Sequence, residues 1–222
     1  MIIIFDLDGT LINTIDDLGQ ACNHALSACG FPTHKIADYP RLVGNGINRL
    51  IERALPEEHR NEAMVLRLRE YFVPYYDAHN CDLTRPYEGI PELLGALKEQ
   101  GYFLAVASNK YQAATEKIVA QLFPGVFDVV LGERENVARK PDPQIVYDIV
   151  EAMRREGDKA KGEDILYIGD SLVDANTARA AKATLVLCTW GFEKKEQLAA
   201  FGPDYLINHP KEILEIVRSF EK

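Results

Sequence analysis

The sequence predicts an α/β fold, a doubly wound parallel sheet with an inserted all-helical domain. Short, continuous apolar runs alternate with helix-like stretches over most of the chain, as in sheets whose strands are buried on both faces. One region, residues 14–84, contains almost no strand-like run and has the pattern of helices instead. We therefore expect one domain made of residues 1–13 and 85–222, and a second, helical domain made of residues 14–84.

The expected strands are rich in β-branched or aromatic residues. They are Ile2–Phe5, Tyr102–Ala107, Phe127–Leu131, Ile165–Ile168 and Thr184–Cys188, with one more short strand at Asp204–Ile207. The helices expected between and after them are Pro91–Gln100, Gln112–Leu122, Pro143–Glu156, Val173–Ala181 and Lys211–Phe220. The first of these helices has both a start and a stop signal, because Pro91 lies at its beginning and Gly101 directly follows it.

The inserted region is expected to be helical throughout. Its helices are predicted at Ile15–Cys29, at Gly46–Leu55 and, as one or two helices, within Glu57–Asn80. Thr14 precedes the first helix and is a residue type that caps helix N-termini, while Gly30 follows it as a stop. Pro74 is expected to kink or break the last stretch, because proline removes a helical hydrogen bond.

The composition argues against several classes of protein. The chain has 222 residues, 47% of them apolar, and a net charge of −9, which disfavours binding to nucleic acid or to an anionic membrane. No apolar run approaches the roughly 18 residues of a membrane span, and we expect no signal peptide. The four cysteines form no CxxC pair, which favours free thiols in a reducing compartment. We expect a cytoplasmic monomer or homodimer that binds neither nucleic acid nor membrane.

Polar side chains follow three of the expected strands. Asp6 ends the first apolar run, Ser108-Asn109 ends the run that begins at Tyr102, and Asp170-Ser171 follows Ile165–Ile168. In open parallel sheets ligands bind beyond the carboxyl ends of the strands, so these side chains are expected at one edge of the sheet. Any one of them alone is also explained as a helix cap or a turn residue.

A basic residue is expected at the same edge. Lys140 lies in the segment Ala138–Pro143, between an expected strand and a helix, and the two prolines of that segment restrict its backbone. A lysine in a loop is usually solvated, but a rigidly held ammonium is suited to bind a phosphate oxygen.

These groups together point to one kind of chemistry. Carboxylates from Asp6, Asp8 and Asp170 suit a hard cation, Mg²⁺ above all, and the chain has no His or Cys at the spacing of zinc ligands. A cation, a lysine and a serine hydroxyl, with backbone N–H groups around Gly9 and Thr10, describe a site for a phosphoryl group. One carboxylate is then available as a nucleophile, and the aspartate two residues on as an acid and base.

The four segments resemble the motifs of the haloacid dehalogenase-like hydrolase superfamily, and of its phosphatases in particular. DLDGT at 6–10 is similar to the first motif, Ser108-Asn109 to the second, Lys140 in RKPDP to the third, and GDSLVD at 169–174 to the fourth. The resemblance covers the whole chain and implies a Rossmann-like core with a helical cap inserted after the first motif. It therefore assigns residues 14–84 to a cap that sets the substrate.

The resemblance also implies roles for individual residues. Asp6 would be the nucleophile and Asp8 the general acid and base, while Ser108 and Lys140 would bind the phosphoryl group, with Asn109 beside them. Dehalogenases lack an aspartate at the position of Asp8 because a halide leaves unaided. Asp8 therefore favours phosphoryl transfer.

The same resemblance implies a Mg²⁺ site. The cation would be held by the Asp6 side chain, the backbone carbonyl of Asp8 and the side chain of Asp170. Asp174 would anchor a metal-bound water or Lys140 from one turn into the following helix. Ser171 stands where the motif often has threonine, and it keeps the hydroxyl.

Within the expected cap, RLVGNG at 41–46 and IERAL at 51–55 resemble the cap motif of phosphoglycolate phosphatases. Gly44, Asn45 and Gly46 would offer backbone donors to a small anion such as a carboxylate, helped by Arg41 or Arg49. A plain turn with a helix start explains the same residues without a ligand. The function expected from the sequence is a Mg²⁺-dependent phosphatase for a small-molecule phosphate ester, with 2-phosphoglycolate as the best single candidate.

Three alternatives remain from the sequence. A pyrophosphatase or a phosphohexose mutase on the same scaffold would keep the same acidic cluster, although the Gly-Asn-Gly loop weighs against both. A non-catalytic receiver or binding module that carries a phospho-aspartate would need neither Asp8 as an acid nor a large cap.

Overall fold

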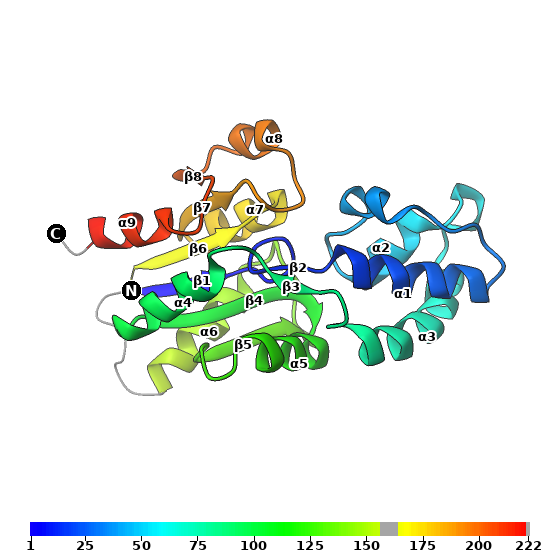
Figure 1. Cartoon of the computed structure of the whole chain (residues 1–222), viewed down its shortest axis with the longest axis horizontal. Helices are drawn as coiled ribbons and strands as arrows, with labels where there is room; N and C mark the ends of the chain where they lie inside the picture. Colours follow the sequence, from blue (N-terminus) through cyan, green and yellow to red (C-terminus); the bar gives the residue numbers. More distant parts are fainter. Residues whose placement is uncertain (156–163, 221–222) are drawn as a thin grey trace. The chain divides into compact units, whose positions relative to one another are not determined.

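The computed structural model describes residues 1–155 and 164–220 of the chain (Figure 1). It divides into two compact units, one formed by Met1–Ile12 and Pro86–Lys222 and the other by Asn13–Arg85. Each division lies one residue from the boundary expected from the sequence. The predicted end of a helix at Glu156 lies outside the described residues.

The first unit is built on a six-stranded sheet with the strand order β5-β4-β1-β6-β7-β8. The strands are β1 Ile2–Phe5, β4 Phe103–Tyr111, β5 Val129–Glu133, β6 Ile165–Gly169, β7 Thr184–Cys188 and β8 Tyr205–Ile207. Neighbouring strands pair in parallel. This order is that of a Rossmann-like doubly wound sheet, which confirms the predicted fold class.

Helices cover this sheet. They are α4 Ile90–Glu99, α5 Gln112–Leu122, α6 Gln144–Arg155, α7 Leu172–Ala180, α8 Lys195–Ala200 and α9 Glu212–Ser219. Apolar residues of α6, α7 and α8 form one buried cluster with alternate residues of the strands, such as Ile2 and Ile4 of β1. Figure 1 shows α4 and α9 in front of the sheet and α6 behind it. The short helix α8 was not expected from the sequence, because it spans only six residues.

The order in which strands are added reverses in the middle of the sheet, at β1. Strand β1 lies between β4 and β6: after β1 the chain adds β4 and β5 on one side, and it then forms β6, β7 and β8 on the other side. In folds of this kind ligands bind at the carboxyl ends of the strands beside such a reversal. The carboxyl ends of β1, β4 and β6 are therefore the place to look for a site.

Strand β4 is longer than the sequence suggested. The expected strand ended at Ala107, but β4 continues through Ser108 and Asn109 to Tyr111. Its register against β5 shifts between Ala107 and Tyr111, because four steps along β4 correspond to two steps from Leu131 to Glu133. Ser108 and Asn109 thus lie within an irregular strand end rather than after the strand.

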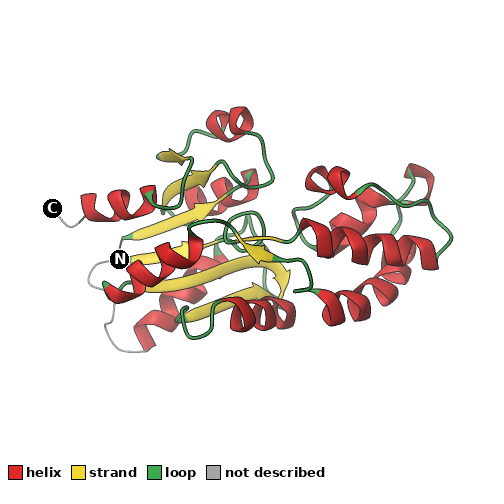
Figure 2. Cartoon of the chain, viewed as in Figure 1, coloured by secondary structure: helices red, strands yellow, loops and turns green. Residues whose placement is uncertain are grey.

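The second unit is mainly helical (Figure 2). It contains α1 Ile15–Ala28, the 3₁₀ segment Ile36–Arg41, α2 Ile47–Ala54, the 3₁₀ turn Glu57–His59 and α3 Glu62–His79. At the two places where the chain passes between the units, β2 (Ile12–Asn13) and β3 (Arg85–Pro86) form a two-stranded sheet. None of the described helices combines the length and apolar character of a membrane span.

Two local expectations for this helical unit were met only in part: Thr14 lies at the N-cap position of α1 without capping through its side chain, and Pro74 does not break α3. Thr14 does precede α1, but its hydroxyl makes no capping hydrogen bond; instead, the backbone N–H of Ile15 donates to the side-chain oxygen of Asn13 at 3.2 Å. Pro74 lies inside α3 and does not end it. The helix tolerates proline there because packing of its apolar residues, such as Phe72 and Tyr76, compensates the lost hydrogen bond.

Candidate active site

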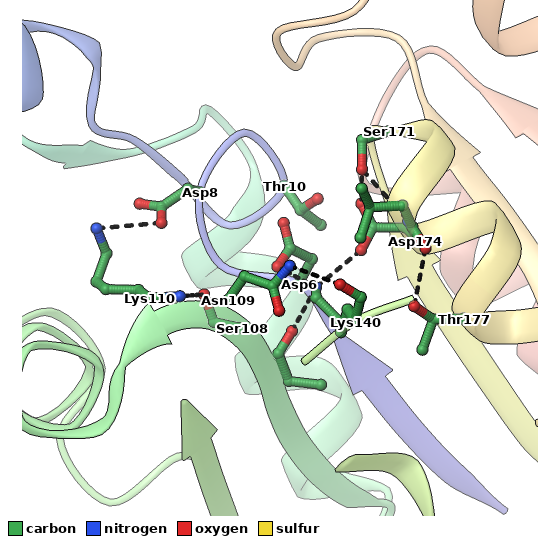
Figure 3. Close-up of polar contacts among 12 residues, drawn as sticks. Asp6, Asp8, Thr10, Ser108, Asn109, Lys110, Lys140, Ser171, Asp174 and Thr177 are labelled. Carbon is green, nitrogen blue, oxygen red and sulfur yellow. Dashed lines mark hydrogen bonds and ion pairs between the residues drawn. The ribbon is translucent and has the colours of Figure 1, made fainter. Parts of the chain in front are cut away.

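Asp6 and Lys140 form a buried ion pair at the carboxyl end of β1 (Figure 3). The Lys140 ammonium lies 2.6 Å from Asp6 Oδ1, 2.7 Å from the carbonyl oxygen of Ala107 and 2.9 Å from Asp174 Oδ1. An ammonium group has three protons to donate, so these three acceptors satisfy it completely. Lys140 thus ties together the ends of β1 and β4 and the start of α7.

Asp170 is held beside this pair by tight backbone packing. The carboxylate accepts a hydrogen bond from the backbone N–H of Phe192 at 2.7 Å and lies 3.4 Å from the hydroxyl of Thr10. A Cβ atom at Gly9 would lie 2.2 Å from Asp170 Oδ2, and one at Gly191 would lie 2.3 Å from the same atom. Gly9 also has a φ of +93°. Only glycine therefore allows the loop after β1 to approach this carboxylate so closely.

Asp174 is occupied by several donors. Its Oδ1 accepts from Lys140 at 2.9 Å and from the Tyr167 hydroxyl at 3.2 Å, and its Oδ2 accepts from the Ser171 hydroxyl at 2.5 Å. The backbone N–H of Asp170 also donates to Oδ2, at 3.3 Å. Asp174 is thus placed to orient Lys140 and the start of α7.

Burial changes the protonation of Asp6 and Asp170. Burial raises the pKa of Asp6 from 3.8 to about 7, and the Lys140 ammonium only partly opposes this. Burial, reinforced by Asp174 and Asp6, also raises the pKa of Asp170 well above its usual value. Burial acts to lower the pKa of Lys140, but the carboxylates of Asp174 and Asp6 outweigh it and hold that pKa well above 10.5. The site therefore contains more buried carboxyl groups than one ammonium can keep ionised.

The donor set fits a divalent metal ion. Asp6, Asp170 and Asp174 each offer a carboxylate oxygen, and these oxygens all lie within 4.8 Å of one another. All three residues are buried, and burying several carboxylates is costly unless a cation balances them. Oxygen ligands of this kind suit a hard cation such as Mg²⁺.

Asp8 lies on the other side of Asp6 from Lys140 in Figure 3, where it pairs with Lys110. The Lys110 ammonium is 3.1 Å from Asp8 Oδ2, and the two side chains are 4% and 17% exposed. The remaining oxygen, Asp8 Oδ1, is buried and has no hydrogen-bond partner among the described residues. Asp8 thus offers one oxygen that is held by a charge and one that is available.

The end of β4 holds the second predicted motif. The Ser108 hydroxyl is buried and accepts a hydrogen bond from the backbone N–H of Lys110 at 3.1 Å. The Asn109 side-chain amide donates to the carbonyl oxygen of Lys140 at 3.0 Å. Asn109 therefore connects β4 to the Lys140 segment, whose Lys140–Pro141 peptide bond is cis.

The loop predicted to bind an anion lies in the helical unit. Gly44, Asn45 and Gly46 all have a positive φ, and Gly46 directly precedes α2. The Arg53 guanidinium lies 3.1–3.4 Å from the carbonyl oxygens of Leu42, Val43 and Gly44, which fixes the loop from its carbonyl side. Arg41 is exposed and forms an ion pair with Asp38 at 3.1 Å, and Arg49 pairs with Glu52 at 2.5 Å.

Comparison with known proteins identifies the family. Residues 3–188 match the profile of the family described as haloacid dehalogenase-like hydrolase. The chain belongs to the haloacid dehalogenase-like hydrolases. Phosphoglycolate phosphatase from Aquifex aeolicus is 31% identical to it over 97% of this chain and 96% of that protein. Phosphoglycolate phosphatase from Mesorhizobium japonicum is 34% identical over 94% of this chain and 90% of that protein.

Solved structures agree with this assignment. A crystal structure from Haemophilus somnus 129PT, described as a predicted phosphoglycolate phosphatase, is similar with a TM-score of 0.86 and 30% identity over 97% of both chains. One from Lactobacillus delbrueckii subsp. bulgaricus reaches a TM-score of 0.89, also at 30% identity and over 97% of both chains. The family and the enzyme class expected from the sequence, a phosphatase similar to phosphoglycolate phosphatases, are therefore confirmed.

Several residues of the site of this hydrolase were not expected from the sequence. Lys110 was not among the expected site residues. Its one signal in the sequence is its place two residues after Ser108, the spacing that puts side chains on one face of a regular strand. The loop at Gly191 and Phe192, which holds Asp170, carries no recognisable signal because it acts through its backbone. The Trp190 indole, which donates to the carbonyl oxygen of Thr10 at 3.0 Å, was missed as well.

Proposed function

We propose that this hydrolase is a Mg²⁺-dependent phosphomonoesterase that forms an aspartyl-phosphate on Asp6, and that its substrate is a small phosphorylated acid, best represented by 2-phosphoglycolate. One observation carries the proposal. The Asp6 carboxylate at the end of β1 is buried, is held by Lys140 at 2.6 Å and shares a carboxylate cluster with Asp170. A nucleophile, a fixed cation and a set of oxygen ligands thus meet at one point.

Mg²⁺ would be held by the side chains of Asp6 and Asp170 and by the backbone carbonyl of Asp8. When bound, it would neutralise the charge of the phosphoryl group and of the cluster. Asp174 contributes differently, because its two oxygens already accept from Lys140, Tyr167 and Ser171. We therefore assign Asp174 and Ser171 to the support of the site.

The two chemical steps use Asp6 and Asp8. In the first step a carboxylate oxygen of Asp6 attacks phosphorus, the bond from phosphorus to the alcohol oxygen breaks, and Asp8 donates a proton to that oxygen. In the second step a water molecule gives its proton to Asp8 and attacks phosphorus, and the bond to Asp6 breaks. Inorganic phosphate and the alcohol are the products, and both aspartates return to their starting states.

Other residues bind and stabilise the phosphoryl group. Lys140 supplies a fixed positive charge, although its three protons are already donated to Asp6, Asp174 and the carbonyl of Ala107. The Ser108 hydroxyl adds a donor to the proposed phosphate site, and Asn109 supports it through its contact with Lys140. The backbone N–H groups of Gly9 and Thr10, expected from the sequence to join it, instead donate to the carbonyl oxygens of Ile12 at 2.9 Å and Leu7 at 3.4 Å.

The proposed substrate rests on the helical unit and on the relatives. Gly44, Asn45 and Gly46 would donate backbone N–H groups to the carboxylate of the substrate, and Arg41 would add a charge. The Arg53 contacts support this reading, because they fix the loop through the carbonyl oxygens of Leu42, Val43 and Gly44, and a guanidinium does not compete for backbone N–H groups. The names of the relatives from Aquifex aeolicus and Mesorhizobium japonicum point to the same substrate.

The first experiment compares wild type with Asp6→Asn in the hydrolysis of p-nitrophenyl phosphate with Mg²⁺. We expect kcat to fall at least about 10³-fold, because the nucleophile is lost. Glu99→Gln, which makes the same change at the exposed end of α4, is the matched control and should retain full activity. Mass spectrometry of acid-quenched wild type should detect one phosphoryl group on Asp6. Wild-type rates in Asp6→Asn would refute the proposal.

The second experiment measures kcat/KM for 2-phosphoglycolate, sugar phosphates, nucleotides and pyrophosphate. A clear preference for 2-phosphoglycolate is the expected result. A preference for pyrophosphate or conversion of hexose phosphates would favour the pyrophosphatase or mutase instead, and no turnover of any substrate would favour a binding module.

A further inference from the structure

Lys110 makes an unusual contact for a lysine. Its side chain is 4% exposed, and its ammonium lies 3.1 Å from Asp8 Oδ2. Lysine is seldom buried unless a partner offsets the cost of removing its charge from water. The partner here is the aspartate that the proposed mechanism uses as acid and base, so the position of Lys110 bears on that mechanism.

The backbone of Lys110 is fixed from both sides. Its N–H donates to the Ser108 hydroxyl at 3.1 Å, and its carbonyl oxygen accepts from the Thr115 hydroxyl at 3.1 Å. A Cβ atom at Gly132 of β5 would lie only 2.5 Å from that carbonyl oxygen. The neighbouring strand therefore packs directly against the Lys110 backbone.

The irregularity of β4 determines the direction of the Lys110 side chain. Two extra residues stand on β4 between Ala107 and Tyr111, and strand irregularities of this kind redirect side chains beside active sites. The gap in the ladder is closed by Gln112, whose amide donates to the carbonyl oxygen of Val130 at 2.9 Å and accepts from the backbone N–H of Gly132 at 2.6 Å. The distortion is thus supported by its own hydrogen bonds.

We propose that Lys110 is a positioning residue for Asp8, which holds Oδ2 of the carboxylate so that Oδ1 is the oxygen that exchanges the proton with the leaving group. The proposal rests on the proposed function. Oδ1 is buried and has no hydrogen-bond partner within the described part of the chain, whereas Oδ2 can accept from Lys110 whether or not Oδ1 carries a proton. In the first step the proton moves from Oδ1 to the alcohol oxygen as its bond to phosphorus breaks; in the second it moves from water to Oδ1.

Leaving groups of different acidity test this role. The p-nitrophenolate ion leaves with little help from a proton, whereas an alkoxide requires one. Lys110→Met should therefore lower kcat/KM about 10- to 100-fold for ethyl phosphate and 2-phosphoglycolate, and less than about threefold for p-nitrophenyl phosphate. Lys110→Arg, which keeps the charge, should restore part of the loss. Lys117→Met, on the exposed face of α5, is the matched control and should leave all three substrates unchanged.

A double-mutant cycle with Asp8→Asn decides whether Lys110 acts through Asp8. If it does, Lys110→Met should change kcat/KM for ethyl phosphate less than about twofold in the Asp8→Asn background. The inhibition constant of inorganic phosphate should be the same for Lys110→Met as for wild type, because phosphate binding does not use this proton.

Three results would overturn the inference. An equal loss with alkyl and p-nitrophenyl phosphate would indicate a structural role. A loss confined to 2-phosphoglycolate and absent with ethyl phosphate would make Lys110 a binding residue for the substrate's carboxylate. A full loss in the Asp8→Asn background would show that Lys110 acts independently of Asp8. Failure of the proposed function is distinct, because it would appear as full activity of Asp6→Asn with every substrate.

Discussion

The ion pairs in the carboxylate cluster of the core differ from those on the surface of the helical unit in sequence separation and in exposure. In the core, Lys140 joins Asp6 and Asp174 across 134 and 34 residues of sequence, and the pairs are buried. In the helical unit, Arg41–Asp38 and Arg49–Glu52 join residues three apart, at side chains that are 34–70% exposed. The first arrangement is costly without a compensating cation or substrate, and the second costs little and stabilises little.

The helical unit also contains a buried carboxylate, that of Asp17, whose oxygens accept several hydrogen bonds. Asp17 of α1 is 2% exposed and accepts hydrogen bonds from the backbone N–H groups of Leu83 and Thr84 and from the Thr84 hydroxyl, at 2.7–3.1 Å. These donors tie α1 to the segment that follows α3. Burial alone therefore does not mark a reactive carboxylate; the shortage of donors and the crowding with other carboxylates do.

The largest expected effect comes from removing the central charge of the core cluster. Lys140→Met leaves Asp6 and Asp174 buried without their common partner, so stability should fall by roughly 3–5 kcal/mol and kcat by more than about 100-fold. Lys98→Met, which removes a lysine 39% exposed and paired with Asp128 at 2.8 Å, is the matched control and should cost less than about 1 kcal/mol. Urea unfolding measures the loss of stability, and hydrolysis of p-nitrophenyl phosphate measures the loss of kcat. Similar losses in the two variants would mean that the buried pair is no different from an exposed one.

The contrast between the two regions also explains what could be predicted from the sequence. Continuous apolar runs determine where buried strands lie, and polar residues at their ends must then meet at one edge of the sheet. Asp6, Asp170 and Lys140 were therefore expected close together, and the structure places them so. Their catalytic roles stay predictions until variants are measured.

The remainder of the site depends on geometry that no pattern encodes. The register shift in β4 that aims Lys110 arises from how β4 pairs with β5, and the approach of Gly191 to Asp170 depends on a distant loop. In the helical unit, Asn13 rather than Thr14 accepts from the first turn of α1, although both residue types favour that position. Which residue makes each of these contacts depends on how the helices, strands and loops pack against one another.

A smaller effect should appear in the pH dependence of the metal-free protein. Burial raises the pKa of Asp6 from 3.8 to about 7, so the folded chain keeps a proton that the unfolded chain has lost over this range. The contribution of Asp6 to the free energy of unfolding is therefore fully present below pH 3.8. It is lost as the pH rises to about 7, with a slope of about 1.4 kcal/mol per pH unit.

Thermal unfolding in EDTA measures this slope. Between about pH 5 and about pH 7, the Tm of wild type should fall by several degrees relative to the Tm of Asp6→Asn, which cannot ionise at this position. Addition of Mg²⁺ should stabilise wild type more at the higher pH and so flatten the difference. A difference in Tm that stays constant with pH would show that Asp6 is not the group whose ionisation the fold opposes.

The smallest expected effect concerns the exposed charges of the helical unit. Arg41→Ala removes an ion pair with Asp38 whose arginine side chain is 70% exposed, so the free energy of unfolding should change by less than about 1 kcal/mol. If Arg41 contacts the carboxylate of the substrate as proposed, KM for 2-phosphoglycolate should rise about 3- to 10-fold, which corresponds to roughly 0.6–1.4 kcal/mol. KM for p-nitrophenyl phosphate, which has no carboxylate, should not change.

Arg49→Ala is the matched control for this variant, because Arg49 is 58% exposed and pairs with Glu52 on α2 in the same unit. We expect its kinetics with both substrates to equal those of wild type. If Arg49→Ala raises KM for 2-phosphoglycolate and Arg41→Ala does not, the roles of the two arginines must be exchanged. If neither does, recognition of the carboxylate rests on the backbone N–H groups of Gly44–Gly46, because an exposed arginine that already has a carboxylate partner adds little to binding.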